Sequence, residues 1–287
     1  SQYSAGDIHE DEHNDMHMLY RALVTGVRDY VNKCGFSKAV VGISDGIDSA
    51  LVCAVARDAI GKENVTAVLL PTQYSSQAEI ALAKKLAENL GISFETANIQ
   101  RSFEVLNQEV DRFGGSEGNS SENLQSRVRS AALTAIANRL GAIVLGTGNM
   151  TEIRAGYFSV AGDLACGFAP LLHIPKTLVL QLVAEHVNRE SEVIPKELLQ
   201  LTPSAELKPN PHDTAEISQI VDVENALNIL LGRKLEAKPE NAEKFGRIAN
   251  GLLASAYKQR MLPLGLKVTN PPFQFDFEIA AAHGLKL

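Results

Sequence analysis

Several features that would assign a protein to a particular class are missing from this sequence. Its 287 residues contain no apolar run long enough to span a bilayer, and the net charge of -7 includes no long block of lysine or arginine. These absences argue against a membrane protein and against a dominant surface for nucleic acid. The acidic, polar N-terminus shows no secretory signal, so we expect a soluble globular protein of the cytoplasm.

Cysteine is scarce, and its spacing argues against a disulfide framework. Only three cysteines occur, Cys34, Cys53 and Cys166, and no two of them form a C-x-x-C pair. Cys34 and Cys53 resemble the small apolar residues of helices. This usage fits a reducing compartment better than an oxidising one.

Short apolar stretches alternate with helical patterns as far as residue 145. Such stretches are typical of buried strands, which we expect at residues 39–43, 65–70, 92–98 and 142–145. Between them, Ser76 and Glu79 form a capping box at the start of a helix that ends at Leu90. The alternation predicts an α/β fold with a doubly wound parallel sheet. Right-handed crossovers would bring the loops 44–48, 71–76 and 146–149 to one edge of this sheet, where ligands bind.

The pattern changes after residue 152. We expect an irregular stretch over 156–170, a Pro-rich loop over 201–213, and helices over 176–187, 217–230 and 242–257. No second sheet is visible, so the simplest interpretation is one domain over residues 1–287 with a helical C-terminal cover. We expect a disordered tail over 1–15, a C-terminal tail over 266–287 and a mobile Gly/Ser-rich loop over 113–121.

One turn gives the clearest chemical signal. The expected strand at 39–43 is followed by the residues S-D-G-I-D-S at 44–49 and then by an apolar helix. A strand, a turn with glycine and a helix N-terminus form an anion site, because unpaired N–H groups point out of the first helical turn. Asp48 suits a phosphate site if a cation lies between the two, which suggests Mg²⁺. On the turn alone, an ordinary strand-to-helix connection capped by Asp48 stays an alternative.

The turn resembles the S-G-G-x-D-S loop of the ATP pyrophosphatases. It lacks the G-x-x-x-x-G-K-[ST] pattern of a Walker A loop. The pyrophosphatases split ATP between the α and β phosphates, and this loop holds the departing pyrophosphate. Asp45 stands where that family has its first glycine.

Further segments resemble, in the same order, the motifs of the NAD synthetases. They are N-x-x-x-R-x-R at 123–129, G-T-x-N-x-x-E at 146–152, G-[YF]-[FA]-[ST]-x-x-G-D at 156–163, K-T at 176–177, P-[ST]-A-x-L at 203–207 and [HY]-K-R…P at 257–263. Each segment is weak alone, but the ordered set is specific. The chain most resembles the synthetase domain of the bacterial glutamine-dependent NAD synthetases, which implies a Rossmann-like fold of the adenine nucleotide alpha-hydrolase type.

The resemblance implies an ATP-dependent ligase that amidates deamido-NAD to NAD and releases AMP and pyrophosphate. The nicotinate carboxylate would attack the α-phosphorus of ATP, and ammonia would then attack the adenylated carbonyl. No Glu/Lys/Cys amidase set is recognisable, and the cysteines have no evident activating base. We therefore expect free ammonia as the nitrogen donor for this chain, with any glutaminase in a domain or partner outside it. The resemblance also implies a homodimer.

The resemblance assigns roles to residues by their motif positions. ATP and pyrophosphate would be bound by Gly42, Ser44, Asp45, Gly46, Asp48, Ser49, Thr147, Lys176 and Ser204. Deamido-NAD would be bound by Arg127, Asp163, Tyr257 and Lys258. Mg²⁺ would be held by Asp48 and Glu152. The catalytic residues would be Asp48, Asp163, Lys176 and Ser204.

Two other functions stay open on the sequence. One is another adenylating ATP pyrophosphatase, such as a GMP-synthetase or tRNA-thiolating type, although the segments around Arg127, Glu152 and Lys258 weigh against it. The other is a nucleotide-binding homologue impaired in catalysis by Asp45. Val160, where many family members have lysine, and the loose match at 211–214 leave the substrate contacts open.

Asp45→Gly should raise activity and tighten the binding of ATP or pyrophosphate. Two like charges about 5 Å apart repel by roughly 3 kcal/mol at an effective dielectric near 20, and Mg²⁺ and Lys176 would offset part of this. The remaining penalty of about 1–3 kcal/mol corresponds to roughly ten- to a hundredfold in phosphate affinity. Steady-state kinetics and pyrophosphate titration measure the effect.

Asp45→Asn should recover part of the gain, because it removes the charge and keeps the shape. An unchanged or lower kcat/KM in Asp45→Gly would show that the repulsion is absent.

Overall fold

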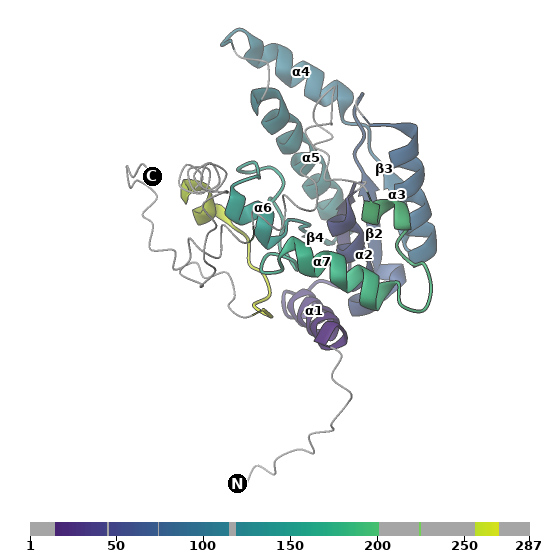
Figure 1. Ribbon diagram of the computed structural model, residues 1–287. Helices are drawn as coiled ribbons and strands as arrows, with labels where there is room; N and C mark the ends of the chain where they lie inside the picture. The colour runs from purple at the N-terminus through teal and green to yellow at the C-terminus, as the bar shows by residue number, and fades with distance from the viewer. Residues whose placement is uncertain are drawn as a thin grey trace, which may run out of the picture.

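Four strands form one parallel sheet at the centre of the molecule (Figure 1). The computed structural model describes residues 15–44, 46–73, 75–114, 119–200, 224 and 256–269. Within them the strands are β1 Ala39–Ile43, β2 Val65–Leu69, β3 Ser93–Thr96 and β4 Ile143–Leu145, in the order β3-β2-β1-β4. Because β1 pairs with β2 on one side and with β4 on the other, the strand order reverses beside β1. Ligands bind at such a reversal in open α/β sheets.

The helices alternate with the strands, as the sequence predicts. The α-helices are α1 Asp15–Lys33, α2 Ile47–Ile60, α3 Gln77–Leu90, α4 Gln100–Asp111, α5 Asn119–Leu140, α6 Met150–Ala155, α7 Lys176–Leu182 and α8 Lys196–Gln200. Short 3-10 helices are η1 Lys62–Asn64 and η4 Ala256–Met261, and a π-helical turn, η2 Val183–Val187, continues α7. None of the helices in the described ranges is long and apolar enough to cross a bilayer.

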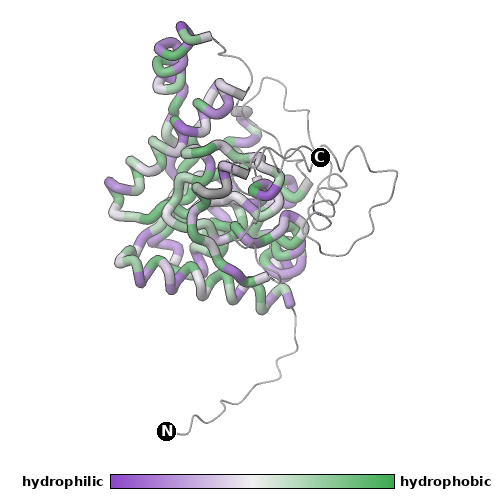
Figure 2. The backbone as a smooth tube through the Cα atoms, turned by 90° about the vertical axis from the view of Figure 1, so that its left-hand side faces the viewer, coloured by the Kyte–Doolittle hydropathy of each residue, from purple (hydrophilic) through white to green (hydrophobic). Residues whose placement is uncertain are grey.

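The side chains of the sheet divide between two cores, one on each face. Ala39, Val41 and Ile43 of β1 join a core with α1, α2, α3 and α7, whereas Val40 joins a core with Val128 of α5. Successive residues of a strand point to opposite faces, so both faces need a helical cover. Along the helices, apolar and polar residues alternate in short intervals (Figure 2), which is the pattern of helices with one buried side. The predicted doubly wound α/β fold is confirmed.

Several local predictions agree with the structure. Ser76 Oγ accepts a hydrogen bond from the Glu79 N–H at 3.1 Å, and Glu79 Oε2 accepts one from the Ser76 N–H at 2.7 Å, so the capping box is formed. Gly91 ends α3 with a φ of 66°, in the left-handed region that glycine enters without a Cβ clash. Both observations follow from local sequence, which is why they were predictable.

Other boundaries need correction. The expected loop over 113–121 is wrong over 119–121, because α5 begins at Asn119, and asparagine and serine are favoured at helix N-termini. Residues 115–118 lie outside the described residues. The expected tail over 1–15 is wrong at its last residue, because Asp15 begins α1 and an acidic residue is favourable in a first turn. Residues 1–14 lie outside the described residues. The expected helices over 217–230 and 242–257 lie outside the described residues, apart from Glu224 and the start of η4. The helical C-terminal cover stays a prediction.

Leu51→Ala should lower the free energy of unfolding by about 3–5 kcal/mol, because truncation leaves a cavity. Leu51 of α2 is fully buried in the core on its face of the sheet. Urea denaturation followed by circular dichroism measures the change. The control is Leu106→Ala on α4, where the side chain is 43% exposed. It should lose less than about 1 kcal/mol. Equal losses in the two variants would contradict the placement of Leu51.

Candidate active site

The turn between β1 and α2 is closed by its own hydroxyl groups. Ser49 Oγ donates a hydrogen bond to the Gly46 carbonyl at 2.8 Å. The N–H groups of Ser44 and Gly46 donate to the Oγ atoms of Ser49 and Ser44, at 3.2 and 3.0 Å. Gly46 precedes α2 in an extended conformation, with φ -85° and ψ 140°. This is the strand, turn and helix N-terminus that an anion site requires.

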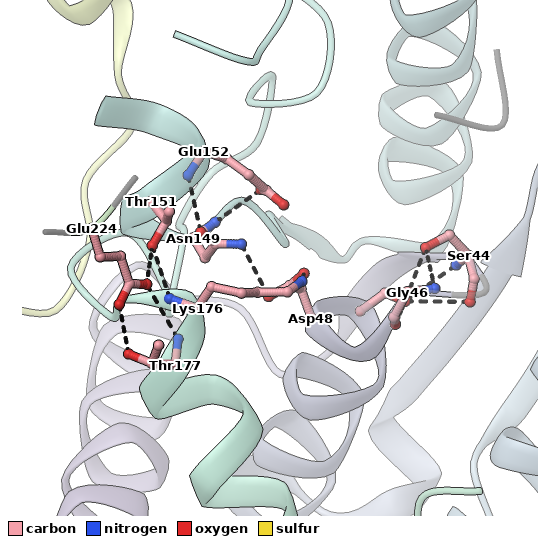
Figure 3. Close-up of polar contacts among 10 residues, drawn as sticks. Ser44, Gly46, Asp48, Asn149, Thr151, Glu152, Lys176, Thr177 and Glu224 are labelled. Carbon is pink, nitrogen blue, oxygen red and sulfur yellow. Dashed lines mark hydrogen bonds and ion pairs between the residues drawn. The ribbon is translucent and has the colours of Figure 1, made fainter. Parts of the chain in front are cut away.

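Asp48, in the first turn of α2, is the centre of a buried polar cluster (Figure 3). Only 8% of this residue is exposed. Its Oδ2 forms an ion pair with Lys176 Nζ, and its Oδ1 accepts a hydrogen bond from Asn149 Nδ2 at 3.2 Å. Lys176 begins α7 and Asn149 precedes α6, so three segments far apart in the sequence meet at one carboxylate.

Glu152 adds a second carboxylate to this cluster. Burial is the main cause that raises its pKa, to about 7, and the Asp48 carboxylate raises it further, against the opposing effects of Lys176 and of hydrogen bonds from Asn149. Burial alone would lower the pKa of the Lys176 ammonium, but the Asp48 and Glu152 carboxylates outweigh burial, and this pKa is raised. The Lys176 ammonium is therefore paired with the Asp48 carboxylate and also attracted by the charge of Glu152.

Asn149 connects the start of α6 to this cluster. Its side-chain oxygen accepts a hydrogen bond from the Glu152 N–H at 3.1 Å, and Glu152 Oε2 accepts one from the Asn149 N–H at 3.4 Å, which makes a capping box. The amide NH₂ of the same side chain is then free of the helix and donates to Asp48. Helix capping and the orientation of Asp48 thus depend on one fully buried side chain.

The two carboxylates fit a divalent cation. Mg²⁺ is usually bound by one or two carboxylates, with substrate phosphates and water as the other ligands. Burial and the nearby Asp48 carboxylate raise the pKa of Glu152, and a cation bound between the two carboxylates would relieve both effects. In the part of the chain that the structure describes, no three His, Cys, Asp or Glu side chains gather at one point. Asp48 and Glu152 are therefore the residues that could hold Mg²⁺, with substrate completing the site.

A cavity of about 190 Å³ lies at the carboxyl ends of β1, β2 and β4. Its polar lining side chains are Ser44, Ser126, Arg129, Ser130, Thr147 and Asp163. Gly42 forms part of its wall, where an added Cβ would press on Leu133 at 3.2 Å. The predicted convergence of the strand ends at one edge of the sheet is confirmed. Gly42, Ser44, Thr147 and Asp163, which come from separate motifs, share this cavity.

Asp163 holds the loop 156–163 against α5. One of its carboxylate oxygens accepts a hydrogen bond from Ser126 Oγ at 2.5 Å, and the other accepts one from the Ser159 N–H at 2.7 Å. Within the loop, Ala161 has a φ of 58°, a left-handed conformation that is unfavourable for a residue with a Cβ. The contacts of Asp163 offset this local strain.

Arg127 and Lys258 bind the same loop from two other elements. Arg127 Nε donates to the Val160 carbonyl at 3.1 Å. Lys258 Nζ donates to the carbonyls of Gly156 and Phe158, at 3.0 and 2.9 Å. Three of the four residues predicted to bind deamido-NAD therefore gather around one loop.

Three other predicted residues are not placed in the Asp48 cluster, in the cavity or around the loop 156–163. Tyr257 is 56% exposed. Asp45 and Ser204 lie outside the described residues, so their roles stay predictions.

Sequence reasoning missed four polar residues of this region, Asn149, Thr151, Thr177 and Glu224. The Asn-x-x-Glu spacing of the capping box was a signal that could have indicated the role of Asn149. No local signal marks Glu224, because its hydrogen-bond partners Thr151 and Thr177 are 73 and 47 positions away in the sequence.

Residues 19–262 of the chain match the NAD synthase family. The chain belongs to this family. Its curated relatives include two glutamine-dependent NAD(+) synthetases. The one from Synechocystis sp. is 41% identical over 270 residues, and the one from Acinetobacter baylyi is 41% identical over 279 residues. These matches cover 90% and 93% of this chain, but 48% and 51% of the relatives. The chain spans about half the length of the curated relatives that it matches.

Solved structures of NAD synthase relatives have the same fold. NMN synthetase from Francisella tularensis superposes with a TM-score of 0.72 at 28% identity, over 85% of this chain and 95% of that chain. A glutamine-dependent NAD+ synthetase from Acinetobacter baumannii, in complex with ADP, superposes with a TM-score of 0.63 at 29% identity. That match covers 98% of this chain and 51% of the other.

Glu152→Gln should raise the free energy of unfolding at pH 8 when a chelator removes divalent cations. The pKa of the carboxyl rises from 4.5 to about 7 on folding, so between these values the folded state binds more protons and stability falls as pH rises. The glutamine variant lacks this charge, and its gain should be about 1–3 kcal/mol above pH 7 and shrink toward pH 5.

Denaturant titrations at pH 5 and pH 8 measure this gain. Glu190→Gln is the control, because Glu190 is exposed and its variant should change stability little at either pH. A gain from Glu152→Gln that is equal at both pH values would contradict the raised pKa.

Proposed function

We propose that this chain catalyses the ATP-dependent amidation of deamido-NAD to NAD through an adenylated intermediate, with release of AMP and pyrophosphate. The main supporting observation is the buried Asp48–Lys176 pair with Glu152 beside it, at the start of the helix that follows β1. Membership of the NAD synthase family and the names of the relatives support the same reaction class.

The phosphate end of ATP would lie on the turn between β1 and α2. The Ser44 and Ser49 hydroxyls and the first N–H groups of α2 are the donors there, and they would exchange their mutual hydrogen bonds for phosphate oxygens. Lys176 adds a positive charge where the departing pyrophosphate gains negative charge. Adenylation needs alignment of two anionic substrates and neutralisation of charge more than a protein nucleophile.

Asp48 and Glu152 would hold Mg²⁺, which when bound neutralises phosphate charge. Asn149 and Lys176 each bind one oxygen of Asp48 and fix the plane of its carboxylate. These residues therefore orient the metal ligands before any substrate arrives.

The rest of ATP would lie in the cavity, and deamido-NAD would bind at the loop 156–163. We propose that Thr147 contacts ATP in the cavity, where it lies with Ser44. Asp163, Arg127 and Lys258 would bind deamido-NAD, and the two cations would attract its phosphates. The bound ADP in the Acinetobacter baumannii relative supports a nucleotide site in this fold.

Ammonia is the nitrogen donor that we propose for this chain assayed by itself. The relatives are named glutamine-dependent, and they are about twice as long. Burial raises the pKa values of the Cys53 and Cys166 thiols to about 12, so both stay protonated and are poor nucleophiles toward glutamine. A glutaminase domain or partner outside these residues would supply ammonia when glutamine is the donor. The homodimer and the cytoplasmic location stay predictions.

A second candidate substrate is the carboxylate precursor of NMN, which lacks the adenylate half of deamido-NAD. The Francisella tularensis relative, which matches over 95% of its own chain, is named NMN synthetase. A smaller substrate would need fewer contacts beyond the loop 156–163. Deamido-NAD and the carboxylate precursor of NMN are therefore both tested as substrates in the assay below.

The purified chain with ATP, Mg²⁺, deamido-NAD and ammonium should form NAD, AMP and pyrophosphate in equal amounts. Omission of any one reactant should stop the reaction, and glutamine in place of ammonium should give no NAD. Asp48→Asn and Glu152→Gln should each lower Mg²⁺-dependent turnover by about ten- to a hundredfold, because each removes a charge from the metal site. Chromatography of the nucleotides measures all of these outcomes.

Glu190→Gln is the control here too, and its turnover should equal that of the parent chain. Equal rates with glutamine and ammonium would refute the proposed donor. Absence of product from both precursors, or release of AMP and pyrophosphate without an amide, would refute the proposed reaction.

A further inference from the structure

One carboxylate, that of Glu224, binds the starts of both α6 and α7. Its Oε1 accepts hydrogen bonds from Thr151 Oγ1 at 2.6 Å and from the Thr177 N–H at 3.2 Å, and its Oε2 accepts one from Thr177 Oγ1 at 2.7 Å. Thr151 belongs to α6 and Thr177 to α7. In Figure 3, Glu224 lies beside these two threonines, while the Lys176 side chain extends away from them toward Asp48.

These contacts reach the backbone of Lys176. Thr151 Oγ1, which donates to Glu224, accepts a hydrogen bond from the Lys176 N–H at 2.9 Å. Pro175, the residue before α7, makes no side-chain capping bond. Glu224 therefore takes the part of an N-cap for α7, and its negative charge is favourable at a helix N-terminus. The first turn of α7 in turn sets the direction in which Lys176 points.

The same contacts fix α6 relative to α7. Thr151 directly precedes Glu152 and lies two positions after Asn149, so all three residues lie at the start of α6. Two direct hydrogen bonds connect the helix starts, from the Met150 N–H to the Ile174 carbonyl at 2.9 Å and from the Lys176 N–H to Thr151 Oγ1 at 2.9 Å. Glu224 adds a third connection, and it is made by a carboxylate, which gives stronger hydrogen bonds than a neutral acceptor.

We infer that Glu224 is a positioning residue for the Asp48–Lys176 pair and acts through the first turns of α6 and α7. This inference rests on the proposed function, because it assigns Glu224 to that reaction. The ammonium of Lys176 must meet both Asp48 and the phosphates of ATP. Small misplacements of such groups slow an enzyme strongly, and residues that orient metal-site side chains have correspondingly large effects.

Glu224→Ala should lower kcat by about ten- to a hundredfold. The KM values for ATP and deamido-NAD should change by less than about threefold, because the interaction that is lost matters most in the transition state. Glu224→Gln keeps the shape and one acceptor oxygen, so it should lose less. Glu185→Gln is the matched control, since Glu185 is exposed on the π-helical turn that continues α7, and its kcat should stay unchanged.

A comparison in the Lys176→Ala variant tests whether Glu224 acts by positioning Lys176 or through a general structural role. If Glu224 acts through Lys176, adding Glu224→Ala to Lys176→Ala should change kcat by less than about twofold. The same fold loss in both backgrounds would overturn the inference, and so would an unchanged kcat in Glu224→Ala alone.

Hydrogen exchange of the segment 174–182, followed by mass spectrometry, gives a readout that needs no activity. Exchange should be faster in Glu224→Ala and in Thr177→Val, which lacks the hydroxyl, than in the parent chain and in Thr177→Ser, which keeps it. A parent chain that forms no NAD would refute the proposed function. The exchange rates would still test whether Glu224 holds the first turn of α7 in place. Unchanged exchange in both altered chains would overturn the inference.

Discussion

The buried ion pair between Asp48 and Lys176 is the interaction on which the arrangement of the site depends. Each ion costs several kcal/mol to remove from water, and mutual attraction offsets this only while the geometry is good. Loss of either partner would leave an uncompensated buried charge, at a cost of about 3–5 kcal/mol. The pair therefore holds the start of α7 against the start of α2 across 128 positions of sequence. Asn149 and Glu224 act as supports for this one contact.

The charges around the pair also constrain what can bind. The Glu152 carboxylate lies beside the Asp48–Lys176 pair, and its burial and the Asp48 charge raise its pKa. A bare polyphosphate would meet repulsion from both carboxylates. A polyphosphate that arrives with a divalent cation would relieve that repulsion, because the cation lies between anions of the protein and of the substrate. In the proposed reaction, the cluster would thus favour a metal–nucleotide complex over the free nucleotide.

The sheet was predictable because its strands are short apolar runs that are buried on both faces, as in β1 and β2. Asp48, Glu152 and Lys176 were named from ordered motifs, and the structure brings them together, while their roles stay predictions. The support from Glu224 was not predictable, because it depends on partners far away in the sequence and on no local spacing. The strained conformation of Ala161 likewise becomes visible only when the loop is folded against α5.

The position of β1 between β2 and β4 has a consequence for the order of folding. Ala39 pairs with Val65 on one side but with Ile143 on the other, more than a hundred residues later. Pairings of such long range close slowly, since a large loop entropy must be overcome first. During synthesis, one edge of β1 therefore stays unpaired until β4 leaves the ribosome, and an unpaired apolar edge is a template for aggregation. A strand that is interior in the finished sheet thus has an open edge in the nascent chain.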